Sequence, residues 1–208
     1  FFTISFNQDY NITFMGIDAA EVSIVNKKTL YKNINANKLN FTANSKGVFN
    51  SLFPVKTNFI NISNLNNELL YFKRQTIQPN MNNHLSTTIY DGILYYNIDN
   101  NKKHPISKQA FTIFTFLYFI ATNDLNQIIN NSYLIDREGI EYNASIEIQG
   151  STKNMVEVKL LLQQIDPMDI AIIEKTDIFT WAVFKKDAVR KIWINSSLYS
   201  WHSSKNFR

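Results

Sequence analysis

The sequence contains no cysteine among its 208 residues, and this absence removes several kinds of chemistry. Disulfide bonds, cysteine-ligated zinc sites and a cysteine nucleophile are all excluded. Glycine and proline are scarce, with five and four copies. The glycines lie far apart, so neither a P-loop nor a G-x-G-x-x-G dinucleotide motif occurs. Asparagine is abundant, and we expect it in turns that need a positive φ, which it tolerates better than most residues.

Histidine and charge are also sparse, which narrows the range of functions. His84, His104 and His202 are scattered, and none has a second histidine or a carboxylate at the spacing of a metal site. We therefore expect neither a metal nor another cofactor. The net charge is only +4, without a dense basic stripe, so the sequence predicts no nucleic-acid partner. Paired lysines such as Lys185 and Lys186 favour at most a peripheral contact with anionic membrane lipids.

Apolar and aromatic residues, in contrast, are plentiful. Hydrophobic residues make up 45% of the chain and include 16 Phe, 10 Tyr and 3 Trp. Charged residues make up 18%, a balance that allows a large core and argues against disorder. Aromatic residues favour β-strands and bury large areas. A chain of this length fits one β-rich domain, so we assign residues 1–208 to a single domain.

The longest apolar run covers residues 110–121 and is the most informative segment of the sequence. Its twelve residues are too few to cross a bilayer, which takes about 20. The run is apolar nearly all round, so it must be buried rather than lie on a surface. A buried strand fits less well than a helix, because the run is long and does not alternate strictly. We expect Phe114, Leu117 and Tyr118 to be largely buried against the sheet.

The rest of the chain has the patterns of antiparallel strands. Asp91-Gly92 separates two strand-like runs and predicts a two-residue hairpin turn with positive φ at both positions. Residues 140–149 alternate between apolar and polar side chains, which indicates a strand with one solvated face. Further strands are predicted over residues 10–15, 20–24, 38–45, 55–63, 69–78, 156–163, 177–184 and 188–199. Residues 46–53 are predicted to form a short helical turn.

Together these elements predict a mainly β fold with about eleven strands in successive hairpins. Open sheet edges invite unwanted pairing, so such a sheet is expected either to close or to coil strongly. We therefore predict a strongly coiled or barrel-like antiparallel sheet around one buried central helix, formed by residues 110–121.

No group of residues predicts catalysis, and we do not expect an enzyme. Glu141 and Glu147 share one face of a strand, but six strand residues place them roughly 20 Å apart, too far for a glycosidase pair. Asp136-Arg137-Glu138 precedes a glycine and is interpreted as a charged hairpin turn. Residues 174–177 carry two acids that we interpret as surface pairing. Neither a G-x-S-x-G nor an H-E-x-x-H motif occurs.

The aromatic strands offer the best candidates for ligand contacts. Tyr95, Tyr96, Trp181 and Trp193 are the residues that we predict to line an apolar pocket. The concave faces and mouths of β-barrels are common ligand sites. The alternative is that all these rings simply fill the core.

Several segments, in order along the chain, are similar to the segments of a known bacterial family. Residues 14–22 and 43–55 are similar to its opening hairpin and the segment that follows, and residues 72–75 to its next strand. Residues 109–120 lie where the family has a helix of the D-x-x-S-x-x-Y-x-x-R kind, without its acidic start or closing arginine. Residues 181–194 resemble the terminal hairpin of this family, which is called domain of unknown function 3108.

The resemblance implies an exported β-rich protein of the periplasm or outer cell envelope, with no established activity. The chain starts at Phe1 without an initiator methionine, so we expect either a trimmed chain or a mature form, from which any signal peptide has already been removed. We therefore expect a non-enzymatic protein that binds a lipid, another apolar or amphiphilic ligand, or an envelope partner. The alternatives are a hydrolase of envelope glycans and a purely structural assembly component.

Overall fold

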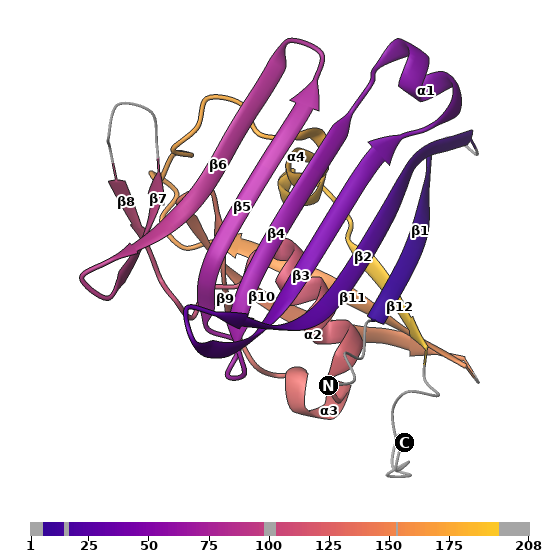
Figure 1. The fold of residues 1–208 in the computed structure, drawn as a ribbon. Coiled ribbons are helices and arrows are strands. Elements are labelled where there is room, and N and C mark those ends of the chain that lie inside the picture. The colour runs from indigo at the N-terminus through magenta and orange to yellow at the C-terminus, as the bar shows by residue number, and fades with distance from the viewer. Residues whose placement is uncertain (1–5, 15–16, 98–102, 153, 196–208) are drawn as a thin grey trace.

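The larger part of the fold is an antiparallel meander of eight strands (Figure 1). The computed structural model describes residues 6–14, 17–97, 103–152 and 154–195. Each strand of the meander pairs antiparallel with the next one along the chain. The strands are β1 (Phe6–Phe14), β2 (Ile17–Tyr31), β3 (Ile34–Ser45), β4 (Lys56–Asn64), β5 (Leu69–Gln78), β6 (Met81–Tyr90), β7 (Ile93–Asn97) and β8 (Lys103–Ile106).

A second sheet of four antiparallel strands lies behind the first, with its strands running crosswise (Figure 1). Its order is β12-β11-β10-β9, formed by β9 (Tyr133–Arg137), β10 (Ile140–Ser151), β11 (Met155–Gln164) and β12 (Lys191–Asn195). Four helices complete the described chain: α1 (Gly47–Leu52), α2 (Ile113–Thr122), α3 (Leu125–Ile128) and α4 (Ile178–Phe184). In the described chain, no helix combines the length and the apolar character that crossing a bilayer requires.

Helix α2 packs between the two sheets and confirms the prediction of a buried central helix. The ring of Phe114 lies 4.0 Å from that of Phe41 in β3 and 4.2 Å from that of Phe59 in β4, measured between centroids. On the other side, the ring of Phe116 lies 5.2 Å from that of Tyr133 in β9. The prediction of burial is right for Phe114, whereas Leu117 and Tyr118 are only half-buried.

Helix α2 begins at a reciprocal cap made by two threonines. The Thr112 side chain accepts a hydrogen bond from the backbone N–H of Thr115, and the Thr115 hydroxyl accepts one from the backbone N–H of Thr112. Such a capping box satisfies two backbone donors that the first helical turn leaves open. The two threonines therefore stabilise the start of the helix, although β-branched residues are poor helix formers elsewhere.

The prediction of a strongly coiled or barrel-like sheet is wrong. The strand order of the large sheet runs from β1 to β8 without a pairing that joins its ends, and neither sheet is closed or strongly curled. Closure is unnecessary because α2 and the second sheet cover the apolar face of the meander. The edge at β8 is blunted in another way, since this strand has only four residues and includes Pro105.

The predicted strand over residues 177–184 is also wrong, because this segment forms α4. The Asp177 side chain accepts hydrogen bonds from the backbone N–H groups of Phe179 and Thr180, both at 3.0 Å, and so caps the helix. This local cap outweighs the strand preference of the Ile-Phe-Thr-Trp sequence. The last strand, β12, starts only at Lys191, and the predicted part beyond residue 195 lies outside the described residues.

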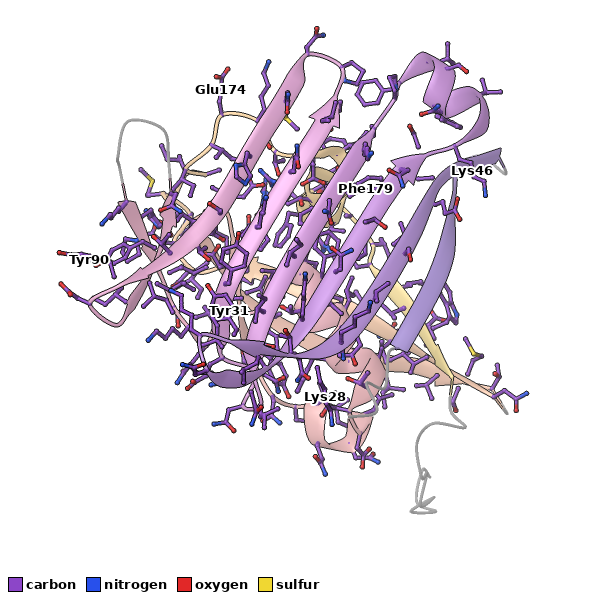
Figure 2. The ribbon with its side chains drawn as sticks, viewed as in Figure 1. Lys28, Tyr31, Lys46, Tyr90, Glu174 and Phe179 are labelled. Carbon is purple, nitrogen blue, oxygen red and sulfur yellow. The ribbon has the colours of Figure 1, made fainter. Side chains whose placement is uncertain are left out.

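The turns follow the sequence closely. Asp91 and Gly92 join β6 to β7 with φ values of 48° and 76°, which confirms the predicted hairpin. Tyr90 projects away from the sheet beside this turn (Figure 2). Asparagine occupies four of the seven described positions where a residue other than glycine has a positive φ. His84 and His104 lie in strands β6 and β8, and His202 is outside the described residues.

The packing of α2 gives a direct test of the core. Phe114→Ala is expected to lower the free energy of unfolding by about 3–5 kcal/mol, because a buried phenylalanine is replaced by a cavity. Urea unfolding monitored by circular dichroism measures the change. Leu52→Ala in α1, where the side chain is 77% exposed, is the control and should shift the value by less than about 0.5 kcal/mol. Equal effects of the two substitutions would contradict this core.

Candidate functional site

A buried arginine stands at the centre of the candidate site. The alternation of β5 places Arg74 on the same face as Phe72, which points into the core between the sheets. Only 1% of Arg74 is exposed to solvent. Removing a guanidinium from water is expensive unless anionic and hydrogen-bonding partners surround it. The surroundings of Arg74 therefore have to supply negative charge.

Two carboxylates and one hydroxyl lie near one nitrogen of the guanidinium, Nη1. Nη1 of Arg74 donates to Oε1 of Glu138 and lies 3.3 Å from Oδ2 of Asp177. It also lies 3.4 Å from the hydroxyl of Thr176, which itself donates to Glu138. Glu138 and Asp177 are as deeply buried as Arg74. We call these four residues the Arg74 cluster.

The chain brings the Arg74 cluster together from three separate elements. Glu138 lies in the tight turn between β9 and β10, with a positive φ of 54°, followed by Gly139 at 86°. A side chain at Gly139 would collide with Ile172, whose Cγ2 lies 2.8 Å from the position of an added Cβ. Asp177 uses one oxygen to cap α4 and presents the other to Arg74. The cluster thus joins the large sheet, the small sheet and α4.

A second buried polar pair lies beside the cluster. The hydroxyl of Tyr96 in β7 donates to Oδ1 of Asp136 in β9, which also accepts from the backbone N–H of Gly139 at 3.3 Å. Burial raises the pKa of Asp136 to about 7, although both of these hydrogen bonds act in the opposite direction. Burial and the neighbouring Asp136 raise the pKa of Tyr96 well above its usual value.

An open cleft of about 470 Å³ lies next to the Arg74 cluster. Its walls include Phe53, which follows α1, and Ile178 and Trp181 from α4. Its polar lining includes Arg137 and Glu138 from the end of β9 and its turn. Gln78 and five residues of the 171–176 segment, all except Ile172, complete the lining. The cleft therefore combines apolar walls with charged groups, an arrangement typical of small-molecule sites.

Hydrogen bonds fasten the 171–176 segment and the start of α4 to the end of the β5–β6 hairpin. The side-chain amide of Asn83 donates to the carbonyl oxygen of Lys175 at 2.9 Å, and the backbone N–H of Ile178 donates to Oε1 of Gln78 at 3.3 Å. Glu174 projects outward from this segment into solvent (Figure 2). One wall of the cleft is therefore held in place by specific contacts from the large sheet.

Two buried atoms of the cleft lining have no hydrogen-bond partner among the described residues. They are Oε2 of Glu138 and Nε of Arg137. The guanidinium of Arg137 also lies over the ring of Phe184, 5.3 Å from its centroid, which fixes the direction of the side chain. A buried carboxylate oxygen lacks a donor here, and a buried N–H lacks an acceptor. Each of the two atoms therefore has unused hydrogen-bonding capacity beside the cleft.

Two of the buried carboxylates also line a much smaller cavity. Asp136 and Glu138 line a cavity of about 20 Å³ between the sheets, together with Arg74 and Tyr96. This volume holds about one water molecule. Within the described residues, no group of three or more histidine or acidic side chains is arranged to bind a metal ion.

The four predicted ligand-binding residues lie in different places. Tyr96 is buried and bonds to Asp136, while Tyr95 is half-buried on the opposite face of β7, near the ammonium group of Lys103. Trp181 is 52% exposed and lines the cleft, and Trp193 in β12 is 57% exposed and does not line it. Of the four, Trp181 is thus placed at the cleft and Tyr96 at the smaller cavity.

The central residues of the site were not predicted from the sequence. Residues 136–138 were interpreted as a charged hairpin turn, and Glu138 does lie in the turn between β9 and β10, but Asp136 and Glu138 are buried. The acids of residues 174–177 were interpreted as surface pairing, and here Glu174 is exposed whereas Asp177 is buried. Glu141 is half-buried rather than fully solvated, and Glu147 is exposed as predicted. One available indication was Arg74, which occupies a core-facing position in an otherwise regular strand pattern.

The Arg74 cluster predicts a large effect of removing its one cation. Arg74→Met is expected to destabilise the protein by about 3–5 kcal/mol, because two buried carboxylates then lose their counter-charge. Lys73→Met, at the neighbouring half-buried position on the other face of β5, is the matched control and should have little effect. Chemical denaturation of both variants measures the two changes in stability. Similar unfolding midpoints for the two variants would contradict a structural role for the Arg74 cluster.

The raised pKa of Asp136 predicts a pH dependence with a definite sign. The folded protein holds this proton up to about pH 7, whereas an unfolded Asp releases it near its ordinary value of 3.8. The contribution of Asp136 to stability is therefore fully present below about pH 4 and is lost as the pH rises towards 7. Relative to Asp136→Asn, the wild type should lose about 1–3 kcal/mol between pH 5 and pH 8. Parallel pH profiles of the two proteins would disprove it.

Comparisons with known proteins do not supply a family for this chain. No family model, curated protein or solved structure matches it. The resemblance to the domain of unknown function 3108 accordingly stays a prediction from the sequence. The function has to be argued from the geometry of the cleft and of the Arg74 cluster.

Proposed function

We propose that the protein binds an amphiphilic ligand in the cleft beside the Arg74 cluster and does not transform it. The observation that carries this proposal is the pairing of apolar walls with the buried, unpartnered oxygen Oε2 of Glu138. An apolar portion of the ligand contacts the walls, and a polar group hydrogen-bonds with Glu138. Of the ligands expected from the sequence, an amphiphilic one thus fits the cleft better than a purely apolar one.

The walls supply the apolar part of the interaction. Phe53, Ile178 and Trp181 are large apolar side chains that remain substantially exposed, and all three border this one cleft. Clustered exposed apolar groups commonly mark a binding surface. Covering them removes apolar surface from water and contributes roughly 25 cal/mol per Å² before the entropic costs of binding.

The charges of the lining favour a ligand head group without net charge. Arg137 and Lys175 line the cleft together with Glu138 and Glu174, so two cations balance two anions. The two unpartnered atoms add a more specific requirement, because Glu138 needs a donor and Arg137 needs an acceptor. An amide or hydroxyl head group carries both a donor and an acceptor, whereas a fatty-acid carboxylate offers acceptors alone.

Binding explains the cleft better than glycan hydrolysis does. A glycosidase needs two carboxyl groups on either side of the scissile bond, one of which has to donate a proton. Glu138 has one oxygen bound by Arg74 and Thr176, and Glu174 is exposed without a hydrogen-bond or ion-pair partner among the described residues. Asp136, whose pKa is raised, lines the cavity of about 20 Å³ instead. Export to the cell envelope stays part of the proposal through the family resemblance alone.

Titration with lauramide, whose head group is a neutral amide, tests the proposal. We expect saturable heat release in isothermal calorimetry below the concentration at which the probe aggregates. Trp181→Ala should weaken binding at least about tenfold, since loss of an aromatic contact of about 1.4 kcal/mol has that effect. Trp193→Ala is the matched control, because this tryptophan is equally exposed but does not line the cleft.

The head group is tested with two further measurements. Laurate has the same chain with a charged head and should bind more weakly than lauramide. Glu138→Gln keeps the size of the side chain but replaces one acceptor oxygen with an NH2 donor. This variant should show a smaller preference for lauramide over laurate. Equal binding to wild type and Trp181→Ala, or no binding of either probe, would contradict the proposed function.

A further inference from the structure

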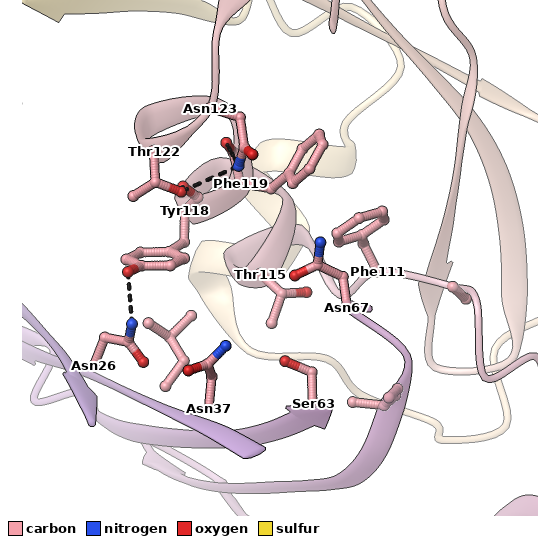
Figure 3. A pocket seen from close by; sticks show the side chains of 13 residues that line it. Asn26, Asn37, Ser63, Asn67, Phe111, Thr115, Tyr118, Phe119, Thr122 and Asn123 are labelled. Atoms are coloured by element: carbon pink, nitrogen blue, oxygen red, sulfur yellow. Dashed lines mark hydrogen bonds between the residues drawn. The ribbon is translucent and has the colours of Figure 1, made fainter. Parts of the chain in front are cut away.

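A second cavity of about 50 Å³ lies between α2 and the large sheet (Figure 3). Residues of β2, β3 and β4 form one side, and α2 with the residues at its two ends forms the other. Its lining shares no residue with the cleft. The cavity is therefore a separate feature that the proposed function does not use.

The lining of this cavity is uncharged and combines polar with apolar side chains. It carries the side-chain amides of four asparagines, the hydroxyls of Ser63, Thr115 and Thr122, and the phenol of Tyr118. No lysine, arginine, histidine or carboxylate belongs to it. The absence of a cation disfavours phosphate and carboxylate ligands, and the absence of an anion disfavours amines. The lining instead suits a neutral molecule with several donors and acceptors.

Some of these polar groups are already used to fix the helical side of the cavity. The side-chain amide of Asn26 donates to the hydroxyl oxygen of Tyr118 at 2.6 Å, a bond that joins β2 to α2 (Figure 3). The hydroxyl of Thr122 donates to the carbonyl oxygen of Tyr118 at 2.8 Å. The side-chain amide of Asn123 donates to the carbonyl oxygen of Phe119 at 2.9 Å. These contacts hold this wall of the cavity in place.

On the sheet side, some polar groups have no hydrogen-bond partner among the described residues. Oδ1 of Asn26 is buried and has no hydrogen-bond partner among the residues that the structure describes. In the same part of the chain, no partner is found for the half-buried side chains of Asn37 and Ser63. Their polar ends point from β3 and β4 towards α2 (Figure 3). Three neighbouring strands thus present an amide oxygen, a complete amide and a hydroxyl to one small space.

We propose that this cavity binds a small neutral polyhydroxyl group, such as glycerol or one edge of a sugar ring. A volume of about 50 Å³ holds about three to five water-sized groups, which matches a few adjacent hydroxyls. The rings of Phe111 and Phe119, 5.2 Å apart between centroids, also line the cavity and offer apolar faces to the C–H side of such a molecule. Hydroxyls satisfy amide donors and acceptors at the same time.

Nuclear magnetic resonance of the full chain with glycerol and methyl glucoside tests this site. We expect the side-chain amide signals of Asn37 and Asn67 to shift and to saturate with a dissociation constant in the millimolar range. The signal of the exposed Asn82 should show no saturable shift. Asn37→Leu keeps a similar volume but removes the hydrogen-bonding groups, and it should weaken binding at least tenfold. Asn35→Leu, an exposed position on the same strand that does not line the cavity, is the matched control.

Other outcomes would overturn the proposal. Linear shifts of equal size at every asparagine would show a general solvent effect, and an unchanged affinity of Asn37→Leu would place binding elsewhere. Inorganic phosphate should give no saturable shift, because the lining has no cation. If Asn37→Leu does not fold, Ser63→Ala provides the same comparison with a smaller change, and full affinity in that variant would remove Ser63 from the site.

Discussion

The need to compensate one buried positive charge shapes much of this structure. Arg74 lies on the core face of a central strand, where an apolar side chain is the usual occupant. Its guanidinium has to find anions inside the fold, and Glu138 and Asp177 supply them from more than sixty residues away in sequence. This requirement holds the β9–β10 turn and the start of α4 against the large sheet. The same contacts position the parts of the cleft lining that come from this turn and from α4.

Glu138 belongs to both the structural cluster and the cleft, so the two are energetically connected. One of its oxygens bonds to Arg74 and Thr176, and the other is unpartnered. A bound donor would satisfy the second oxygen without disturbing the first. Binding at the cleft would thereby stabilise the junction of the two sheets, because a ligand that binds only the folded state raises its stability.

Local turn chemistry could be predicted from the sequence, whereas long-range compensation could not. Asp91-Gly92 and the helix at residues 113–122 depend on neighbouring residues, and both were predictable. Helix α4 was not, because its cap residue Asp177 looked like a surface acid in a strand-like sequence. The barrel prediction failed because nothing in the strand pattern shows that a second sheet covers the first. Trp181, which lines the cleft, was among the residues predicted from the sequence to line a pocket. Arg74 and its partners could not be predicted as a group, because they meet only in the folded chain.

The two ends of the large sheet differ in what they offer to another polypeptide. Strand β8 has four residues, one of which is Pro105, so it presents a short and incomplete row of backbone donors. Strand β1 is nine residues long and pairs with β2 alone in the described sheet. Growth of the sheet by addition of a foreign strand is therefore a one-sided process. A foreign strand that joins the eight-stranded sheet would therefore pair with β1 rather than with β8.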